Sequence, residues 1–143
     1  MMGNSNTVRI KKSVKKPLRK VVVATTDEAF EQQMLGMLNG LRKNTIFLHR
    51  TAEVLLTILH RDVDLLILDL EFTGIGGLEL IPIVRKSRPR LPVIVISADF
   101  NYQLRKTVAE EGIFFQAFKP IDEKEANYIA DTAKKVIEEG VHL

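Results

Sequence analysis

Asp69, Ser97 and Lys119 are the residues of this sequence best suited to act together in chemistry. Each one ends an apolar segment, in "LLILD", "VIVIS" and "FFQAFK" respectively. A carboxylate, a hydroxyl and an ammonium group suit phosphoryl transfer, because the carboxylate attacks phosphorus while the other two bind the phosphoryl oxygens. Taken singly, a strand-end aspartate usually caps a helix and a lone lysine is usually solvated. The prediction therefore depends on all three standing at the ends of different strands.

Strands and helices alternate along the 143 residues. Runs of β-branched and apolar residues predict five strands, and apolar residues at helical spacing predict five helices. The predicted strands are 20–24, 45–49, 64–70, 92–97 and 113–118, and the predicted helices are 27–41, 51–60, 77–87, 102–111 and 123–139. In the helix over 51–60 we expect one apolar face made of Ala52, Leu55, Leu56 and Leu59.

Strands that are apolar on both sides predict a five-stranded parallel sheet covered by helices on both faces. With right-handed crossovers, the result is a doubly wound, three-layer α/β/α domain. The working site of such a sheet lies beyond the carboxyl ends of its strands. The residues expected at that edge are Thr25, Thr26, Asp27, Asp69, Ser97, Ala98, Lys119 and Pro120.

The segments around these residues resemble the receiver domains of response regulators. "DLLILDLEFTGIGGLEL" is similar to the third-strand motif of that family, "LPVIVISA" to the fourth and "GIFFQAFKPI" to the fifth. The resemblance covers roughly residues 20–139. It implies a flavodoxin-like receiver fold in a two-component phosphorelay, with Asp69 as the phosphoacceptor and with Ser97 and Lys119 binding the phosphoryl group. It also implies phosphorylation by a histidine kinase or a phosphotransfer protein, and a change of shape in the fourth and fifth βα units.

The acidic pair that ends the first strand in that family is replaced here. Thr25 and Thr26 stand in its place in "VVVATTDEAF", and Asp27 comes one position later. Magnesium prefers oxygen ligands, usually with carboxylates among them, so the replacement predicts a weak or absent Mg²⁺ site. Asp69 is the remaining anionic ligand, and Asp27 and Glu71 are the candidates to supply the missing charge.

The loop after the first strand also has a structural interpretation. Asp27 suits the start of the first helix, where the helix dipole favours a carboxylate. Thr25 with Glu28 matches the spacing of a capping box. The threonine hydroxyls offer a third route to a metal site, since they can position water ligands.

Two further positions depart from the receiver pattern. Thr73 stands where the family often has proline, and Gln116 stands where it commonly has tyrosine or phenylalanine as a rotamer toggle. Phe115 does not replace that toggle, because neighbouring side chains of a strand lie on opposite faces. Two functions therefore stay open. The first is a phosphoacceptor signalling module, which is not an enzyme. The second is a phosphorylation-independent pseudo-receiver that docks partner proteins through the face of residues 102–139.

Charge divides the chain into two parts. Residues 1–20 hold seven of the 21 lysines and arginines and no acid, which leaves 14 basic against 18 acidic residues, a net charge of −4, in the remainder. We expect a receiver-like domain over 20–143 and a basic arm over 1–19. The arm is either a disordered, solvated leader or a contact for an anionic partner.

Composition limits the other classes of function. No apolar run approaches the ~20 residues that span a bilayer. The N-terminus lacks the apolar core of a signal peptide. The absence of cysteine excludes disulfides and thiolate metal sites. We expect a cytoplasmic protein without a membrane span.

Overall fold

A five-stranded parallel sheet in the order β2-β1-β3-β4-β5 forms the centre of the molecule. The computed structural model describes residues 18–60, 63–72, 77–99 and 101–140. The strands are β1 (Val21–Ala24), β2 (Thr45–Leu48), β3 (Leu65–Asp69), β4 (Val93–Ser97) and β5 (Phe115–Phe118). The helices are α2 (Glu28–Met37), α3 (Thr51–Leu59), α4 (Gly77–Ser87), α5 (Tyr102–Glu110) and α6 (Glu123–Lys134). A 3₁₀ segment, η1 (Asn39–Asn44), follows α2, and a π-helical segment, η2 (Lys135–Glu139), follows α6.

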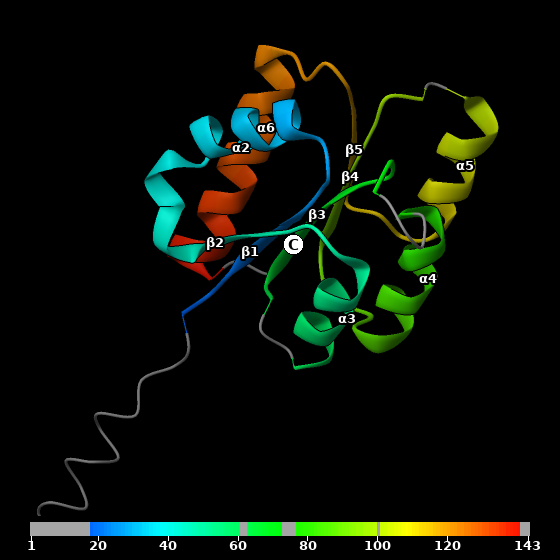
Figure 1. The fold of residues 1–143 in the computed structure, drawn as a ribbon, viewed down its shortest axis with the longest axis horizontal. Coiled ribbons are helices and arrows are strands. Elements are labelled where there is room, and N and C mark those ends of the chain that lie inside the picture. Colours follow the sequence, from blue (N-terminus) through cyan, green and yellow to red (C-terminus); the bar gives the residue numbers. More distant parts are fainter. Residues whose placement is uncertain (1–17, 61–62, 73–76, 100, 141–143) are drawn as a thin grey trace, which may run out of the picture.

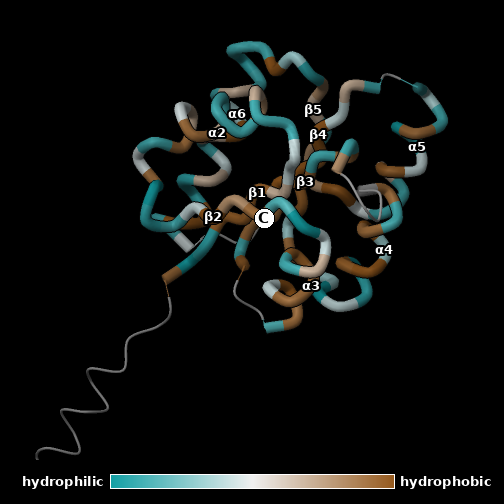
Figure 2. Tube along the Cα trace, viewed as in Figure 1, coloured by the Kyte–Doolittle hydropathy of each residue, from teal (hydrophilic) through white to brown (hydrophobic). Residues whose placement is uncertain are grey.

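The helices cover the sheet in two layers (Figure 1): α2 and α6 lie on one face, and α3, α4 and α5 on the other. Each face has its own core, because the side chains of every strand alternate between the two. Val23, Ile67 and Ile96 pack with α2 and α6, whereas Val22, Leu66 and Val95 pack with α3, α4 and α5. Figure 2 shows hydrophobic residues along the inner strands and hydrophilic residues on the outer turns. The predicted three-layer α/β fold is confirmed.

The strand and helix boundaries agree with the predicted ranges to within a few residues, except at the first helix. The predicted helix over 27–41 ends at Met37 and continues as the 3₁₀ segment η1. The prediction that Thr25 and Glu28 form a capping box was wrong. The N-cap of α2 is Asp27, whose Oδ1 accepts the backbone N–H of Phe30 at 3.1 Å. Thr25 is not the N-cap, because it lies two residues before Asp27 and its hydroxyl donates to Asp69.

The face predicted for the helix over 51–60 was wrong except at Leu55, which packs against the core. In α3 the buried residues are Val54 and Ile58, while Leu56 is 56% exposed and Leu59 is 63% exposed. Leucines occupy both sides of this short helix, so apolar spacing alone did not define the side that meets the sheet. Val54 and Ile58 belong to the core cluster that contains Val22 and Leu66 of the sheet, so packing against that face decided it.

The register of the sheet brings the carboxyl ends of the strands to one edge. Ala24 pairs with Leu68, and Ser97 pairs with Phe118. Thr25, Asp69, Ser97 and Lys119 therefore stand side by side, as expected for a parallel sheet. The predicted basic arm lies almost entirely outside the described residues. Within the described part of the chain, no helix is long and apolar enough to cross a membrane.

Candidate functional site

The Asp69 carboxylate is the centre of the site. It lies at the end of β3, is 1% exposed and accepts hydrogen bonds on both oxygens. Its Oδ2 accepts the hydroxyl of Thr25 at 2.6 Å and Nζ of Lys119 at 2.8 Å. Its Oδ1 accepts the backbone N–H of Glu71 at 2.9 Å. A buried carboxylate is stable only with partners of this kind, so the side chain has one fixed orientation.

Lys119 joins three carboxylates at the edge of the sheet. Its Nζ lies 2.8 Å from Asp69 Oδ2, 3.0 Å from Asp27 Oδ2 and 3.4 Å from Glu71 Oε1. Burial works to lower the pKa of Lys119, but hydrogen bonds to Asp69 and Asp27 outweigh it, and the pKa is raised. The hydrogen bond from Lys119 likewise lowers the pKa of Asp27. The ammonium and the Asp27 carboxylate therefore both stay charged at neutral pH.

Ser97 and Glu71 form the remaining side of the site. The Ser97 hydroxyl donates to Glu71 Oε2 at 3.0 Å, and the backbone N–H of Ala98 donates to Glu71 Oε1 at 2.9 Å. The Ser97 Oγ in turn accepts the backbone N–H of Asp99 at 3.0 Å. Sequence reasoning missed the amide of Ala98 as a functional group. The only signal for it was its position directly after the fourth strand.

The predicted site residues thus come together with one exception. Asp69, Lys119, Asp27, Glu71 and Ser97 form one connected network of hydrogen bonds and ion pairs. Thr25 belongs to it through Asp69, and its Oγ1 also accepts the backbone N–H of Asp27 at 3.0 Å. The exception is Thr26, which is exposed at the start of the loop.

The oxygens near Asp69 do not fit a magnesium ion. The hydroxyl that stands in the acidic pair's first position is fully buried and donates its proton to Asp69. The Asp27 carboxylate caps α2 and pairs with Lys119, and the Glu71 carboxylate binds donors from β4 and β5. Across the described residues, no group of three or more acidic or histidine side chains could hold a metal ion. Octahedral Mg²⁺ needs free anionic oxygens, and here they are already committed to other partners.

Gln116 connects β5, the strand that precedes Lys119, to α5. It lies in the middle of β5, and its Nε2 donates to the backbone carbonyl of Arg105 at 3.1 Å. The guanidinium of Arg105 lies over the ring of Phe118, 5.3 Å from its centre. Phe115 packs into the core on the other face of the sheet, as the strand alternation predicted.

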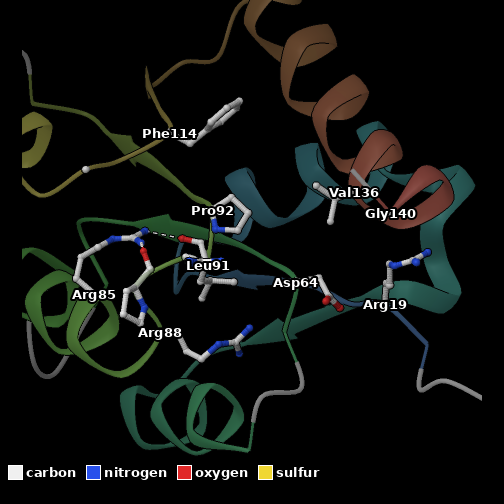
Figure 3. A pocket seen from close by; sticks show the side chains of 12 residues that line it. Arg19, Asp64, Arg85, Arg88, Leu91, Pro92, Phe114, Val136 and Gly140 are labelled. Atoms are coloured by element: carbon white, nitrogen blue, oxygen red, sulfur yellow. Dashed lines mark hydrogen bonds between the residues drawn. The ribbon is translucent and has the colours of Figure 1, made fainter. Parts of the chain in front are cut away.

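A cavity of about 610 Å³ lies at the opposite edge of the sheet (Figure 3). Its arginines bind backbone carbonyls. Arg85 donates to Pro89 at 2.8 Å and to Leu91 at 2.6 Å, and Arg19 donates to Ile137 at 3.2 Å. Burial lowers the pKa of Arg85. These bonds stabilise the chain where strands begin, and the cavity shares no lining residue with the Asp69 network.

Comparison with known proteins identifies the family. The sequence model described as "Response regulator receiver domain" matches residues 21–130, which is most of the chain. The match includes every member of the Asp69 network.

Curated relatives match over part of their length. The DNA-binding transcriptional regulator NtrC of Escherichia coli K12 is 30% identical over 82 residues, or 57% of this chain and 18% of that protein. NtrC of Azospirillum brasilense is 39% identical over 70 residues, or 49% of this chain and 15% of that protein. The chain thus aligns with less than a fifth of these relatives.

Solved structures share the fold. A CheY-like receiver domain protein from Methanospirillum hungatei matches with a TM-score of 0.71 at 17% identity, over 85% of this chain and 95% of that one. The receiver domain of NtrX from Brucella abortus matches with a TM-score of 0.70 at 23% identity, over 80% of this chain and 97% of that one.

Proposed function

Because this chain belongs to the response regulator receiver domain family, we propose that it accepts a phosphoryl group on Asp69 and passes the signal on through protein contacts. It is a module of two-component signalling, and we assign it the role of a phosphoacceptor without turnover of a metabolite. The observation that carries this proposal is the 2.8 Å contact between Lys119 Nζ and a buried Asp69 carboxylate, with Ser97 at the adjacent strand end.

The chemistry is a transfer from phosphohistidine on a histidine kinase or a phosphotransfer protein. An Asp69 carboxylate oxygen attacks phosphorus, and a P–O bond forms while the P–N bond to the imidazole of the donor breaks. The electron pair of that bond stays on the imidazole nitrogen. The Lys119 ammonium and the Ser97 hydroxyl then stabilise the charge on the phosphoryl oxygens.

Positive charge for this step comes from Lys119. Two unit charges ~4 Å apart repel by ~4 kcal/mol at an effective dielectric constant of ~20, so a phosphoryl anion needs a cation beside Asp69. The raised pKa of Lys119 keeps that cation present. Since the oxygens do not fit Mg²⁺, no step is assigned to a metal, and we expect slow phosphorylation with little dependence on magnesium.

The output surface in this proposal is the face made by α5, β5 and α6. Tyr102 and Tyr128 are exposed on it, and Phe114 stacks on Tyr128 with 6.4 Å between ring centres. The bond from Gln116 to the Arg105 carbonyl links the strand that carries Lys119 to α5. A shift at Lys119 therefore has a direct route to this surface, where we place the downstream protein. For the arm over residues 1–19, we propose an anionic partner on charge alone.

The test is phosphorylation by a small donor. The protein is incubated with acetyl phosphate, with and without Mg²⁺, and its mass is measured over time. We expect a gain of one phosphoryl mass in the wild type, and no gain in Asp69→Asn, which keeps the shape of the side chain but lacks the nucleophile.

Two outcomes contradict the proposal. A gain of mass in Asp69→Asn would place the phosphoryl group elsewhere. No gain in the wild type, with a cognate kinase as well as with acetyl phosphate, would leave a protein-docking module that works without phosphorylation.

A further inference from the structure

The carboxylate of Glu71 is held by three donors from two other strand ends. The Ser97 hydroxyl donates to it at 3.0 Å and the Ala98 amide at 2.9 Å, and Lys119 Nζ lies 3.4 Å from Oε1. One hydroxyl, one amide and one ammonium around a single anion form an oxyanion site. Glu71 is therefore bound as a ligand would be.

Two of these donors, Ser97 and Lys119, are the groups that the proposed function assigns to the phosphoryl oxygens. Lys119 contacts Asp69 and Glu71 at once, so the Glu71 carboxylate lies beside the position of a phosphoryl group on Asp69. An O–H or N–H donor makes a strong bond to one anion at a time. The glutamate and the phosphoryl group therefore compete for the same donors.

We propose that Glu71 is an internal ligand of the phosphoryl-binding site, which it fills while Asp69 is unmodified. It keeps Ser97 and the start of the β4–α5 loop in the arrangement of the anion-bound state, and an incoming phosphoryl group must displace it. This inference names the regulation of the proposed phosphoacceptor site and depends on the proposed function only for the identity of the displacing group.

The position of Glu71 permits this exchange. Its side chain is 42% exposed, against 1% for Asp69, so it can rotate into solvent without opening the core. Its backbone stays in place, because its N–H donates to Asp69 Oδ1 at 2.9 Å. Displacement thus requires a change of side-chain rotamer and no change in the strand.

The charges around Asp69 support the same conclusion. Among the residues that the structure describes, Lys119 is the single cation in contact with Asp69, Asp27 and Glu71, so this network is negative. When Glu71 swings outward, its charge moves into solvent and is screened. The site then has one anion less to repel a phosphoryl group.

The first experiment measures anion binding without any phosphodonor. Backbone amide NMR signals of Ala98 and Asp99 are followed during titration with inorganic phosphate in the wild type, Glu71→Ala and Glu71→Gln. For Glu71→Ala we expect about tenfold tighter phosphate binding than for the wild type, within the usual range for coupled sites. Glu71→Gln should lie between them, because its amide oxygen still accepts but carries no charge.

The second experiment measures the initial rate of phosphorylation of Asp69 by acetyl phosphate, with mass as the readout. We expect a higher rate in Glu71→Ala than in the wild type, because the donors are free and one anion less repels the incoming phosphoryl group. The matched control is Glu79→Ala, which removes the same charge from the exposed side of α4 and should change neither readout.

The outcomes separate the two proposals. If phosphate binds equally to the wild type, Glu71→Ala and Glu71→Gln, Glu71 only joins the two loops, and the inference is wrong. If phosphate binding tightens in Glu71→Ala but Asp69 is never phosphorylated, the result supports Glu71 as an internal ligand and contradicts the proposed phosphoacceptor function. If Glu71→Ala does not fold, Glu71→Gln against the Glu79→Ala control decides the question.

Discussion

At the scale of single residues, Lys119 determines the electrostatics of the site. One ammonium group contacts three carboxylates, and these carboxylates differ in how far they are exposed to solvent. Asp69 is buried, whereas Asp27 is 38% exposed and Glu71 is 42% exposed. Water weakens the two exposed pairs, so the pair with Asp69 is the strong one. Asp27 and Glu71 are the partners that can leave when another anion enters.

The pairing of Asp27 with Lys119 predicts a pH dependence of stability. The pKa of Asp27 is lowered in the folded state, so this carboxylate stabilises the fold above its unfolded pKa of about 3.9. The contribution is lost as the pH falls through the lower, folded pKa. In Asp27→Asn the N-cap acceptor is kept and the charge is removed. We expect a loss of about 0.2–1 kcal/mol near pH 7.

Urea unfolding of both proteins between pH 7 and pH 3 tests this prediction. The difference in free energy of unfolding should be constant above about pH 5 and shrink below about pH 4. A difference that does not change between pH 7 and pH 3 would contradict the prediction, because it would show that the charge of Asp27 does not stabilise the fold. Asp27→Ala, which removes cap and charge together, should cost about 1 kcal/mol more than Asp27→Asn at pH 7.

At the scale of elements, α3 shows how a short helix obtains its buried side from the sheet. Its sequence "TAEVLLTIL" has apolar residues on several sides. The helix packs on the face of the sheet that Val22 and Leu66 supply. This contact selects Val54 and Ile58 and leaves two leucines in solvent.

We expect substitutions in α3 to follow the observed burial. Ile58→Ala leaves a cavity in a fully buried position and should lower the free energy of unfolding by about 2–5 kcal/mol. The matched control Leu59→Ala removes a similar volume from an exposed position and should change it by less than about 0.5 kcal/mol. Urea denaturation followed by circular dichroism measures both, and the reverse order of effects would contradict the assigned face.

At the scale of the whole molecule, the carboxyl edge of the sheet combines groups from β1, β3, β4 and β5. In this chain the charged side chains at that edge are paired with other groups of the protein. Asp69 is bonded by a threonine hydroxyl and a lysine, and the oxyanion donors are filled by Glu71. Any ligand that binds there must replace an internal contact, so occupancy of the edge is coupled to the stability of the fold.

This coupling makes magnesium binding measurable as thermal stability. If the dissociation constant is 10 mM or weaker, 10 mM Mg²⁺ stabilises by at most about 0.4 kcal/mol, a shift in Tm of roughly 2 °C or less. In Thr25→Asp/Thr26→Asp, which restores an acidic pair, we expect a lower Tm without metal and a clearly larger rise with Mg²⁺. Calcium and sodium at equal ionic strength are the controls, and a large magnesium-specific shift in the wild type would contradict the weak site.

The sheet follows from the sequence alone, because buried parallel strands must be apolar on both sides and the segments of the three central strands are. The sequence also determined which residues stand at the carboxyl edge, since each follows directly on such a segment. The position of Asp27 at the start of the first helix was predicted as well, because the helix dipole favours a carboxylate there, but its role as the N-cap was not. All of these are properties of neighbouring residues along the chain.

The hydrogen-bond partners of the residues at the edge follow from the three-dimensional arrangement of the strands and not from the sequence pattern. Glu71 was named from the sequence only as a candidate to supply charge to a metal site, and in the structure its carboxylate binds Ser97 and Ala98, which are 26 and 27 residues away. Thr25 was predicted as a cap, yet it donates to Asp69 across 44 residues. The buried side of α3 was likewise decided by contacts with residues far away in the sequence. These contacts depend on the distances between strands and on the burial of each charge, and both are set only once the sheet has formed.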